Sequence, residues 1–227
     1  MKLVKPSIKF LNMTPDPLLA IERAGRTCYK SEEKISKGSA ERFVKMLLDR
    51  DHHAMIEHAA ASYKAITCRG VTHEIVRHRL FSFAQESTRW CNYSKDGVTF
   101  LIPPWVDLPA TTEGKKGFLD DENRYQGWTP PLVKNELRWV RHMIACEEAY
   151  LGAIKDGWIA QKARGLLPID VKTEIVITGN MREWRHFFKL RTHKDSHPQM
   201  QEVANMVLKD IQSRIPILFD EFDENNK

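Results

Sequence analysis

Apolar residues recur at the spacing of an amphipathic helix in several parts of the chain. The first stretch covers residues 16–29, where Pro17 suits an opening helical turn. Ser39 can cap a second helix, whose apolar positions begin at Phe43. Glu147 and Glu148 interrupt the apolar side of a long helix, so one of its turns meets solvent or a polar pocket. The same spacing predicts helices at residues 71–80, 132–158, 181–190 and 198–214, and a short one ending at Arg164.

Short segments rich in β-branched residues predict strands at 60–68, 98–102 and 171–178. Residues 107–131 are polar and contain several glycines and prolines, which predicts a long loop or an insertion. The acidic residues 220–227 are expected to form a frayed tail. Because strands and helices do not alternate regularly, we expect an α+β fold with a small mixed or antiparallel sheet packed by several helices. All 227 residues are expected to form a single domain.

Composition says more about where the protein is located than about which reaction it catalyses. The formal net charge of +5 favours an anionic partner only weakly, because such a balance also serves solubility. No stretch approaches the roughly 18 apolar residues that a bilayer span requires, and no secretory signal opens the chain. Four widely spaced cysteines without a Cys-x-x-Cys pair favour reduced thiols. We therefore expect a cytoplasmic protein with no membrane partner.

The densest chemistry lies in a short run of cations. Arg77, His78, Arg79 and Arg89 occur within thirteen residues, among apolar neighbours. Arginine keeps its charge at any working pH and offers five donors in a planar fork. Guanidinium groups in partly apolar surroundings repel one another unless an anion compensates them, which favours a nucleotide or a phosphate-bearing cofactor. The alternative is that such cations merely complement a helix dipole, which suits one arginine better than the whole set.

Two other clusters admit two interpretations each. His52, His53 and His58 could build a metal hydrolase site, but their spacing from Glu57 fits no standard zinc motif. A polar pocket wall or satisfied interior histidines is the better interpretation, and we expect no metal. A basic helix face, made by Arg182, Arg185 and Lys189, is either solvated or binds single-stranded nucleic acid. No nucleic-acid motif supports the second interpretation, which stays an alternative, and we expect no nucleic-acid partner.

Neither a phosphate-binding glycine loop nor an activated nucleophile is evident. Side chains would therefore hold a nucleotide, and Ser87 lacks a Gly-x-Ser-x-Gly elbow. This favours chemistry carried by a cofactor.

The run Arg77-His78-Arg79, followed after seven residues by Ser87-Thr88-Arg89, resembles the signature of flavin-dependent thymidylate synthases. The spacing alone is moderately specific. Further elements resemble that family in the same order, which makes the set strongly specific. They are the histidine–glutamate element at 52–58, Ala163-Arg164 with Leu167-Pro168, Asn180-Met181-Arg182, Phe187 with Leu190-Arg191, and the ending at 197–203.

The resemblance implies a homotetrameric α+β enzyme that binds FAD near subunit interfaces, with sites shared between subunits. It would methylate dUMP at C5 to give dTMP, with methylenetetrahydrofolate as the carbon donor and NADPH as the reductant. The FAD-binding residues that motif position implies are Ala54, Arg77, His78, Arg79, Gln85, Asn180, Met181, Arg182 and His186. Those implied for dUMP are Glu74, Ile75, Val76, Arg77, Gln85, Glu86, Ser87, Thr88, Arg89, Arg164 and Arg191.

Residue chemistry suits these implied roles. A phosphomonoester carries about −1.5 to −2 charges near neutral pH, which Arg89 and Arg164 would match while Ser87 donates a hydrogen bond. Arg191, the implied catalytic residue, would stabilise negative charge on the uracil ring. The chain departs from the commoner family pattern at Glu74, where glutamine is common. It departs as well at Ala54, where a hydroxyl residue is frequent, and at His186, where asparagine is usual.

Overall fold

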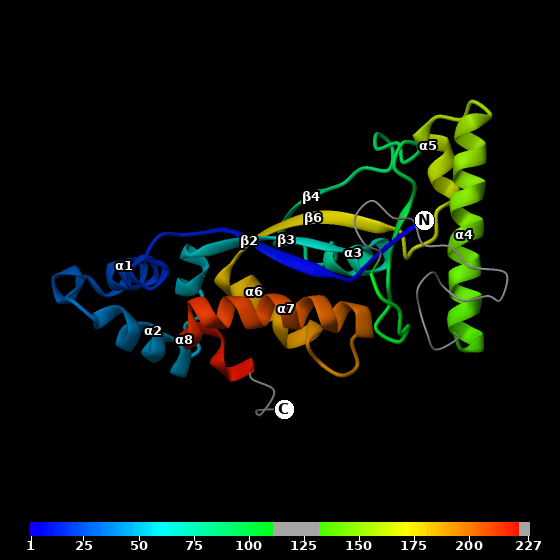
Figure 1. The fold of residues 1–227 in the computed structure, drawn as a ribbon. Coiled ribbons are helices and arrows are strands. Elements are labelled where there is room, and N and C mark those ends of the chain that lie inside the picture. Colours follow the sequence, from blue (N-terminus) through cyan, green and yellow to red (C-terminus); the bar gives the residue numbers. More distant parts are fainter. Residues whose placement is uncertain (111–131, 223–227) are drawn as a thin grey trace. The chain divides into compact units, whose positions relative to one another are not determined.

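The computed structural model describes residues 1–110 and 132–222, and its mixture of elements confirms the α+β class (Figure 1). The strands are β1 (Lys2–Val4), β2 (Ser7–Met13), β3 (Ala60–Cys68), β4 (Ser82–Gln85), β5 (Thr99–Leu101) and β6 (Lys172–Asn180). The α-helices are α1 (Pro17–Tyr29), α2 (Ser39–Asp49), α3 (Arg69–Ile75), α4 (Lys134–Lys155), α5 (Ala160–Ala163), α6 (Met181–Arg191), α7 (Pro198–Arg214) and α8 (Pro216–Phe219). Short 3₁₀ turns cover Glu32–Lys34, Met55–His58, Arg164–Leu166 and Asp220–Phe222.

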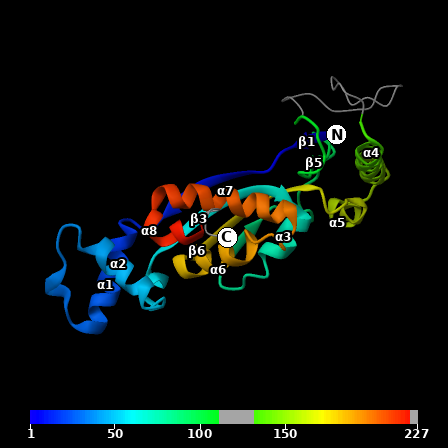
Figure 2. The same cartoon turned by 90° about the horizontal axis from the view of Figure 1, so that it is seen from below.

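The described strands form two sheets rather than the one expected. β1 and β5 pair in parallel, with Leu3 opposite Phe100. The other four strands lie in the order β2-β3-β6-β4. α6 and α7 pack against each other and cover one face of this sheet, as the two views agree (Figures 1 and 2). None of the described helices is both long enough and apolar enough to cross a bilayer.

The chain divides into two compact units that interleave along the sequence. Unit 1 contains Met1–Ser7, Ile66–His73 and Gln85–Ile175, and unit 2 contains Ile8–Ala65, Glu74–Ala84 and Val176–Lys227. Each unit is therefore assembled from segments distant in sequence. That the whole chain forms a single domain stays a prediction.

The core of unit 1 explains why Glu147 interrupts the apolar side of the long helix α4. Apolar side chains of α4, among them Val140 and Met143, pack with Leu3 and Phe100 of the two-stranded sheet. Glu147 is buried in this unit, where its carboxylate accepts a hydrogen bond from Val98 N at 2.9 Å. The same carboxylate lies 2.6 Å from the amino group of Met1. The interruption thus supplies a buried acceptor with two partners, as a buried charge requires.

The core of unit 2 is aromatic and is centred on α6. Trp184 is fully buried, and its ring stacks on that of Phe188 at a centroid distance of 5.7 Å. Phe81 packs on Trp184 from the turn after α3, at 4.6 Å between ring centroids. A Cβ at Gly179 of β6 would lie only 2.0 Å from the Phe81 ring, so the absence of a side chain permits this close approach.

The expected helices at 16–29, 132–158, 181–190 and 198–214 are confirmed, and so are the three strands, with shifts of a few residues at their ends. Three further strands, β1, β2 and β4, were missed. Their segments are short or only half-buried, and apolar alternation is weak in them. Residues 107–110 lie outside helices and strands, as a loop requires, and the rest of the expected loop at 111–131 lies outside the described residues.

Three local expectations were wrong. Ser39 is the first residue of α2 and not its cap; its hydroxyl donates to Glu22 Oε2 at 2.8 Å. The helix expected at 71–80 begins earlier and ends at Ile75, so the arginine motif lies in a turn. The first residues of the expected frayed tail form a 3₁₀ turn, because Phe222 packs at 6.3 Å from the ring of Phe188. Residues 223–227 lie outside the described residues.

Candidate functional site

A pocket of about 560 Å³ in unit 2 gathers residues from three separated segments of the chain. Asn180 begins α6 by accepting a hydrogen bond from Glu183 N at 2.9 Å, an N-cap that fixes where the helix starts. Positions 183, 186 and 190 then share one face of α6, since they are three and four residues apart. The lining residues are Glu57, Arg77, His78, Arg79, Leu80, Asn180, Arg182, Glu183, His186, Leu190 and Arg191.

Seven residues implied by the family motifs meet in this pocket. They are Arg77, His78, Arg79, Asn180, Arg182, His186 and Arg191. Four lining residues were not among the site residues expected from the sequence, namely Glu57, Leu80, Glu183 and Leu190, although Glu57 lies in the segment for which a polar pocket wall was expected. Glu183 and Leu190 could have been found from the helical face they share with His186, whereas Leu80 follows a motif whose conformation the helix prediction misassigned.

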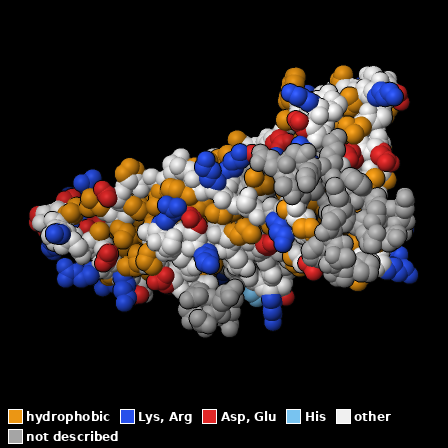
Figure 3. All heavy atoms as spheres, in the orientation of Figure 1, with side chains coloured by type: hydrophobic (Ala, Val, Ile, Leu, Met, Phe, Trp, Pro, Cys, Tyr) orange, Lys and Arg blue, Asp and Glu red, His pale blue; other side chains and the backbone are white. Residues whose placement is uncertain are grey.

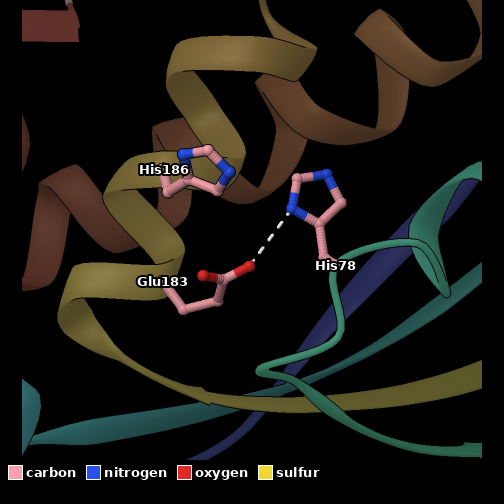
Figure 4. Close-up of side chains that lie close together, drawn as sticks. All are labelled: His78, Glu183 and His186. Carbon is pink, nitrogen blue, oxygen red and sulfur yellow. Dashed lines mark hydrogen bonds and ion pairs between the residues drawn. The ribbon is translucent and has the colours of Figure 1, made fainter.

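His78 connects the pocket wall to Arg191. The Nε of Arg191 donates to Nε2 of His78 at 3.0 Å. On the other side of the ring, Nδ1 of His78 lies 3.2 Å from Glu183 Oε1, the contact drawn in Figure 4. A guanidinium nitrogen can only donate, so Nε2 carries a lone pair and Nδ1 carries the proton. Burial, and then the charges of Arg191 and His186, lower the pKa of His78 to about 4, which keeps the ring neutral. The partners therefore assign one tautomer to His78.

Glu74 holds the same guanidinium from another direction. Nη1 of Arg191 donates to Glu74 Oε2 at 2.9 Å, and Nη2 donates to the Glu74 carbonyl oxygen at 3.4 Å. Three nitrogens of Arg191 thus have partners at the end of α3 and in the turn that follows it. The side chain is fixed in place, with 21% of its surface still exposed.

The other cations of the pocket differ in how they are compensated. Arg182 forms an ion pair with Glu57, 2.5 Å from Nη1 to Oε1, and both side chains are largely exposed. Arg77 and Arg79 are exposed, and their side chains make no hydrogen bond or ion pair within residues 1–110 and 132–222. Their donors are therefore available to an anionic ligand, and the fork of a guanidinium suits phosphate oxygens.

His78, Glu183 and His186 are also close enough together to be tested as a metal site. Their ligand atoms lie within 4.8 Å of one another (Figure 4). Both nitrogens of His78 are engaged, because Nε2 accepts from Arg191 and Nδ1 is protonated toward Glu183. The arrangement is thus that of a hydrogen-bonded chain rather than a set of free metal ligands.

The histidines at positions 52, 53 and 58 take no part in the hydrogen bonds that link Glu183, His78 and Arg191. His52 and His58 are exposed, and His53 is half-buried, so they are not the interior histidines that were one of the two expectations. The nearby Glu57 does line the pocket, which agrees with the polar-wall interpretation of this segment. Burial, followed by the charge of Arg185, lowers the pKa of His53.

A second cavity, of about 310 Å³, lies in unit 1. Thr88 and Arg164, both implied for the nucleotide, line it. So do Arg69 and His73, which sequence reasoning missed. Arg69 had no sequence signal, because a long-range pairing places it: its backbone N donates to Val171 O at 3.2 Å.

The remaining implied residues do not line either cavity. Gln85 donates to Thr72 and Thr173, Glu86 accepts from Tyr93 and Lys172, Ser87 accepts from the backbone of Arg89, and Arg89 donates to Gln161. Ile75 and Met181 are fully buried, whereas Ala54 and Val76 are exposed. Glu74 reaches the pocket only through its contact with Arg191.

The basic face expected on α6 is interrupted at its middle position. Arg185 is only 8% exposed, donates to the Leu218 carbonyl and lies 2.5 Å from Glu221 Oε1. It is therefore not solvated, and it is not available to a nucleic-acid phosphate. The continuous stripe needed for the single-strand-binding alternative is absent from this helix.

A larger hollow of about 1060 Å³ lies elsewhere in unit 2. Its lining includes Leu18 and Leu19 of α1, Leu48 of α2 and Ile217 of α8. Hydrophobic side chains gather over these three helices on the face shown in Figure 3. None of the residues implied by the family motifs lines this hollow.

The α+β fold holds a pocket lined by several cationic side chains, and comparison with known proteins specifies the class of the protein. The family model described as thymidylate synthase complementing protein matches residues 9–217. A flavin-dependent thymidylate synthase of Geobacter sulfurreducens is 29% identical over 220 residues, covering 93% of this chain and 84% of that protein. One of Corynebacterium efficiens is 31% identical over 209 residues, covering 89% and 78%. The chain therefore belongs to the flavin-dependent thymidylate synthases, a family of enzymes.

A solved structure resembles the fold over nearly its whole length. It is the UMP/dUMP methylase PolB from Streptomyces cacaoi, bound with 5-Br dUMP. The TM-score is 0.75, with 23% sequence identity, and the match covers 98% of this chain and 96% of that one. At this identity the likeness concerns the fold alone.

Proposed function

We propose that this enzyme methylates dUMP at C5 to give dTMP, with methylenetetrahydrofolate as the carbon donor and NADPH as the reductant. The observation that carries the proposal is the 560 Å³ pocket, in which seven residues implied by the family motifs meet although they come from distant segments. The seven come from two segments, the turn at 77–79 and the helix α6 with its N-cap, which only the tertiary fold brings together. The similarly folded UMP/dUMP methylase is bound with 5-Br dUMP, which supports a nucleotide of this class as the substrate.

The pocket of unit 2 fits FAD by its charge and by its donors. Arg77 and Arg79 have no compensating partner within the described residues, so their guanidiniums can bind the diphosphate of the cofactor. Leu80 and Leu190 supply apolar surface beside these cations. Bound flavin, once reduced by NADPH, would supply the hydride for the new methyl group.

Arg191 is the residue we assign to catalysis. Its guanidinium is fixed by His78 and Glu74, so it is oriented before a ligand arrives. A fixed cation beside the uracil ring would stabilise the negative charge that develops when C5 becomes nucleophilic. His78 and Glu74 would act as positioning residues, since they hold Arg191 in place.

Two cysteine thiols and Ser87 are poor candidates for a competing protein nucleophile. Burial raises the pKa of the Cys68 and Cys146 thiols, which disfavours their nucleophilic thiolate forms. Ser87 accepts a hydrogen bond from Arg89 N at 3.3 Å, and we assign it no attacking role. A homotetramer with sites shared between subunits, located in the cytoplasm, completes the proposal.

The test begins with the visible absorbance spectrum of the purified protein. A flavoprotein is yellow, and NADPH should bleach its flavin bands. With methylenetetrahydrofolate supplied, the enzyme should release tritium from dUMP labelled at C5. A colourless protein that takes up no FAD and releases no tritium would overturn the proposal.

A further inference from the structure

We infer that Glu183 is a positioning residue for turnover: it fixes the tautomer of His78 and, through that ring, the orientation of the Arg191 guanidinium. The inference rests on the proposed function for the catalytic role of Arg191. All three side chains line the pocket of unit 2. Glu183 and His78 are each only 5% exposed, whereas Arg191 keeps 21% of its side-chain surface exposed. The first two are therefore shielded from solvent, while the cation can reach a ligand.

Glu183 and Arg191 lie near opposite ends of α6 and are bridged by His78. Eight residues separate their positions on the helix, which corresponds to about 12 Å along its axis. His78 comes from the turn after α3 and spans this gap: Nδ1 lies 3.2 Å from Glu183 Oε1, and Nε2 accepts from Arg191 Nε at 3.0 Å. Figure 4 shows the Glu183 carboxylate directed at the His78 ring. A change in the first turn of α6 can thus reach its last residue.

The directions of these hydrogen bonds make Glu183 the acceptor that His78 needs. A neutral ring whose Nε2 accepts from a guanidinium carries its proton on Nδ1, and Glu183 Oε1 receives it. Without that acceptor, the Nδ1–H would be buried and unsatisfied, or the proton would move to Nε2 and face the N–H of Arg191. The second outcome costs less, because Arg191 is partly exposed and can turn toward solvent. Loss of the acceptor therefore releases the guanidinium.

The usual tasks of a glutamate in the first turn of a helix do not account for this side chain. Asn180 already caps α6, since its side chain accepts from Glu183 N at 2.9 Å. A charged carboxylate would favour the helix N-terminus, but burial raises the pKa of Glu183 more than the nearby His186 lowers it, so the charged form is costly here. The hydrogen bond to His78 is the compensation that a buried carboxyl requires.

The experiment follows the tautomer and turnover in the same full-length, flavin-loaded protein. Nitrogen-15 NMR of histidine-labelled protein reports which ring nitrogen carries the proton, and the His78 signals are those absent from His78→Phe. Turnover is measured as tritium release from dUMP labelled at C5. The test variant is Glu183→Leu, which removes the acceptor, and Glu183→Gln keeps an acceptor oxygen without the charge. Glu148→Leu, at an exposed position of α4, is the matched control.

In the wild type, His78 should carry its proton on Nδ1. In Glu183→Leu the proton should move at least partly to Nε2. Turnover of this variant should fall about tenfold or more, because misplacing a group by about 1 Å can cost on the order of 10²-fold in rate. Glu183→Gln should keep the wild-type tautomer and most of the turnover, because its amide oxygen still accepts. Glu148→Leu should match the wild type in both measurements.

The outcomes separate this inference from the proposed function. A wild-type tautomer in Glu183→Leu, or an altered tautomer with wild-type turnover, overturns the inference and leaves the proposed function standing. Equal losses in Glu183→Leu and Glu183→Gln overturn it as well, because the charge and not the acceptor would then be decisive. If the wild type itself releases no tritium, the proposed function fails and the NMR spectra decide: a tautomer that depends on the Glu183 acceptor supports the inference, and one that does not overturns it. Should circular dichroism show that Glu183→Leu is unfolded, Glu183→Met, whose unbranched side chain is closer in shape to glutamate, replaces it with the same expected losses.

Discussion

Nε of Arg191 lies 3.0 Å from Nε2 of His78, and the direction of this hydrogen bond is fixed because only the guanidinium can donate. The contact joins the arginine motif after α3 to the last residue of α6. Glu183 holds the opposite nitrogen of the same ring, at 3.2 Å. The orientation of Arg191 therefore depends on the protonation state of a histidine far away in the sequence.

Arg191→Ala should abolish most turnover while the fold survives. Removing one preorganised electrostatic group costs about 10²–10³-fold in rate in comparable cases. Tritium release from labelled dUMP measures the effect, and Arg50→Ala, at an exposed position after α2, is the control. Activity of Arg191→Ala within a few-fold of the wild type would exclude the arginine from catalysis.

Acid should destabilise the native protein partly through His78. Its native pKa of about 4 lies below the value of roughly 6.5 for an unfolded histidine. Between these values the unfolded chain binds a proton that the native state does not, so the free energy of unfolding falls as pH falls. The full loss across this window is on the order of 3 kcal/mol.

Urea unfolding at about pH 7, 5.5 and 4.5 measures this dependence in the wild type and in His78→Phe. The variant should be less stable near neutral pH, because Glu183 loses its partner. Comparing the variant with the wild type isolates His78, because other titrating groups, such as Asp210, are the same in both proteins. The gap between the two proteins should therefore narrow toward acid, and parallel curves would contradict the assignment.

Glu74→Gln should strengthen dUMP binding several-fold. The carboxylate now compensates Arg191 at 2.9 Å, and an amide would keep an acceptor there while removing the negative charge. Arg191 would then attract an electron-rich ring more strongly, and the increase should shrink at high salt. Calorimetry at two salt concentrations measures both effects, and weaker binding by Glu74→Gln at low salt would disprove this account of the ion pair.

Gly179→Ala should destabilise unit 2 by about 1–3 kcal/mol, because the added methyl group overlaps the Phe81 ring. Gly152→Ala in α4 is the matched control, since nothing lies within 4 Å of its Cβ position. That change should be neutral or stabilise the protein by up to about 1 kcal/mol, as alanine favours a helix. Chemical denaturation measures the free energy of unfolding of the two variants. Equal values for both would show that the Phe81 ring moves aside without destabilising the protein.

Sequence reasoning predicted the helices best, because their evidence is local. The apolar spacing in α1, α4, α6 and α7 depends only on neighbours within each segment, and all four helices are present. The end of the helix before Arg77 was missed because a tertiary contact decides it: His78 turns inward, where it packs on Phe187 of α6 at 5.0 Å between ring centroids. Helical propensity alone does not encode that burial.

By itself the sequence determined the fold class, the family motifs and the residue types available to bind an anion. Only the tertiary structure decided which of these residues meet: Arg77, Arg182 and Arg191 share one pocket, whereas Arg185 is buried against Leu218 and Glu221. It also decided that Arg69, which belongs to no recognised motif, faces a cavity with Arg164. The physical reason is that a side chain's partners and charge state depend on groups brought close by packing, and local periodicity carries no record of those distant neighbours.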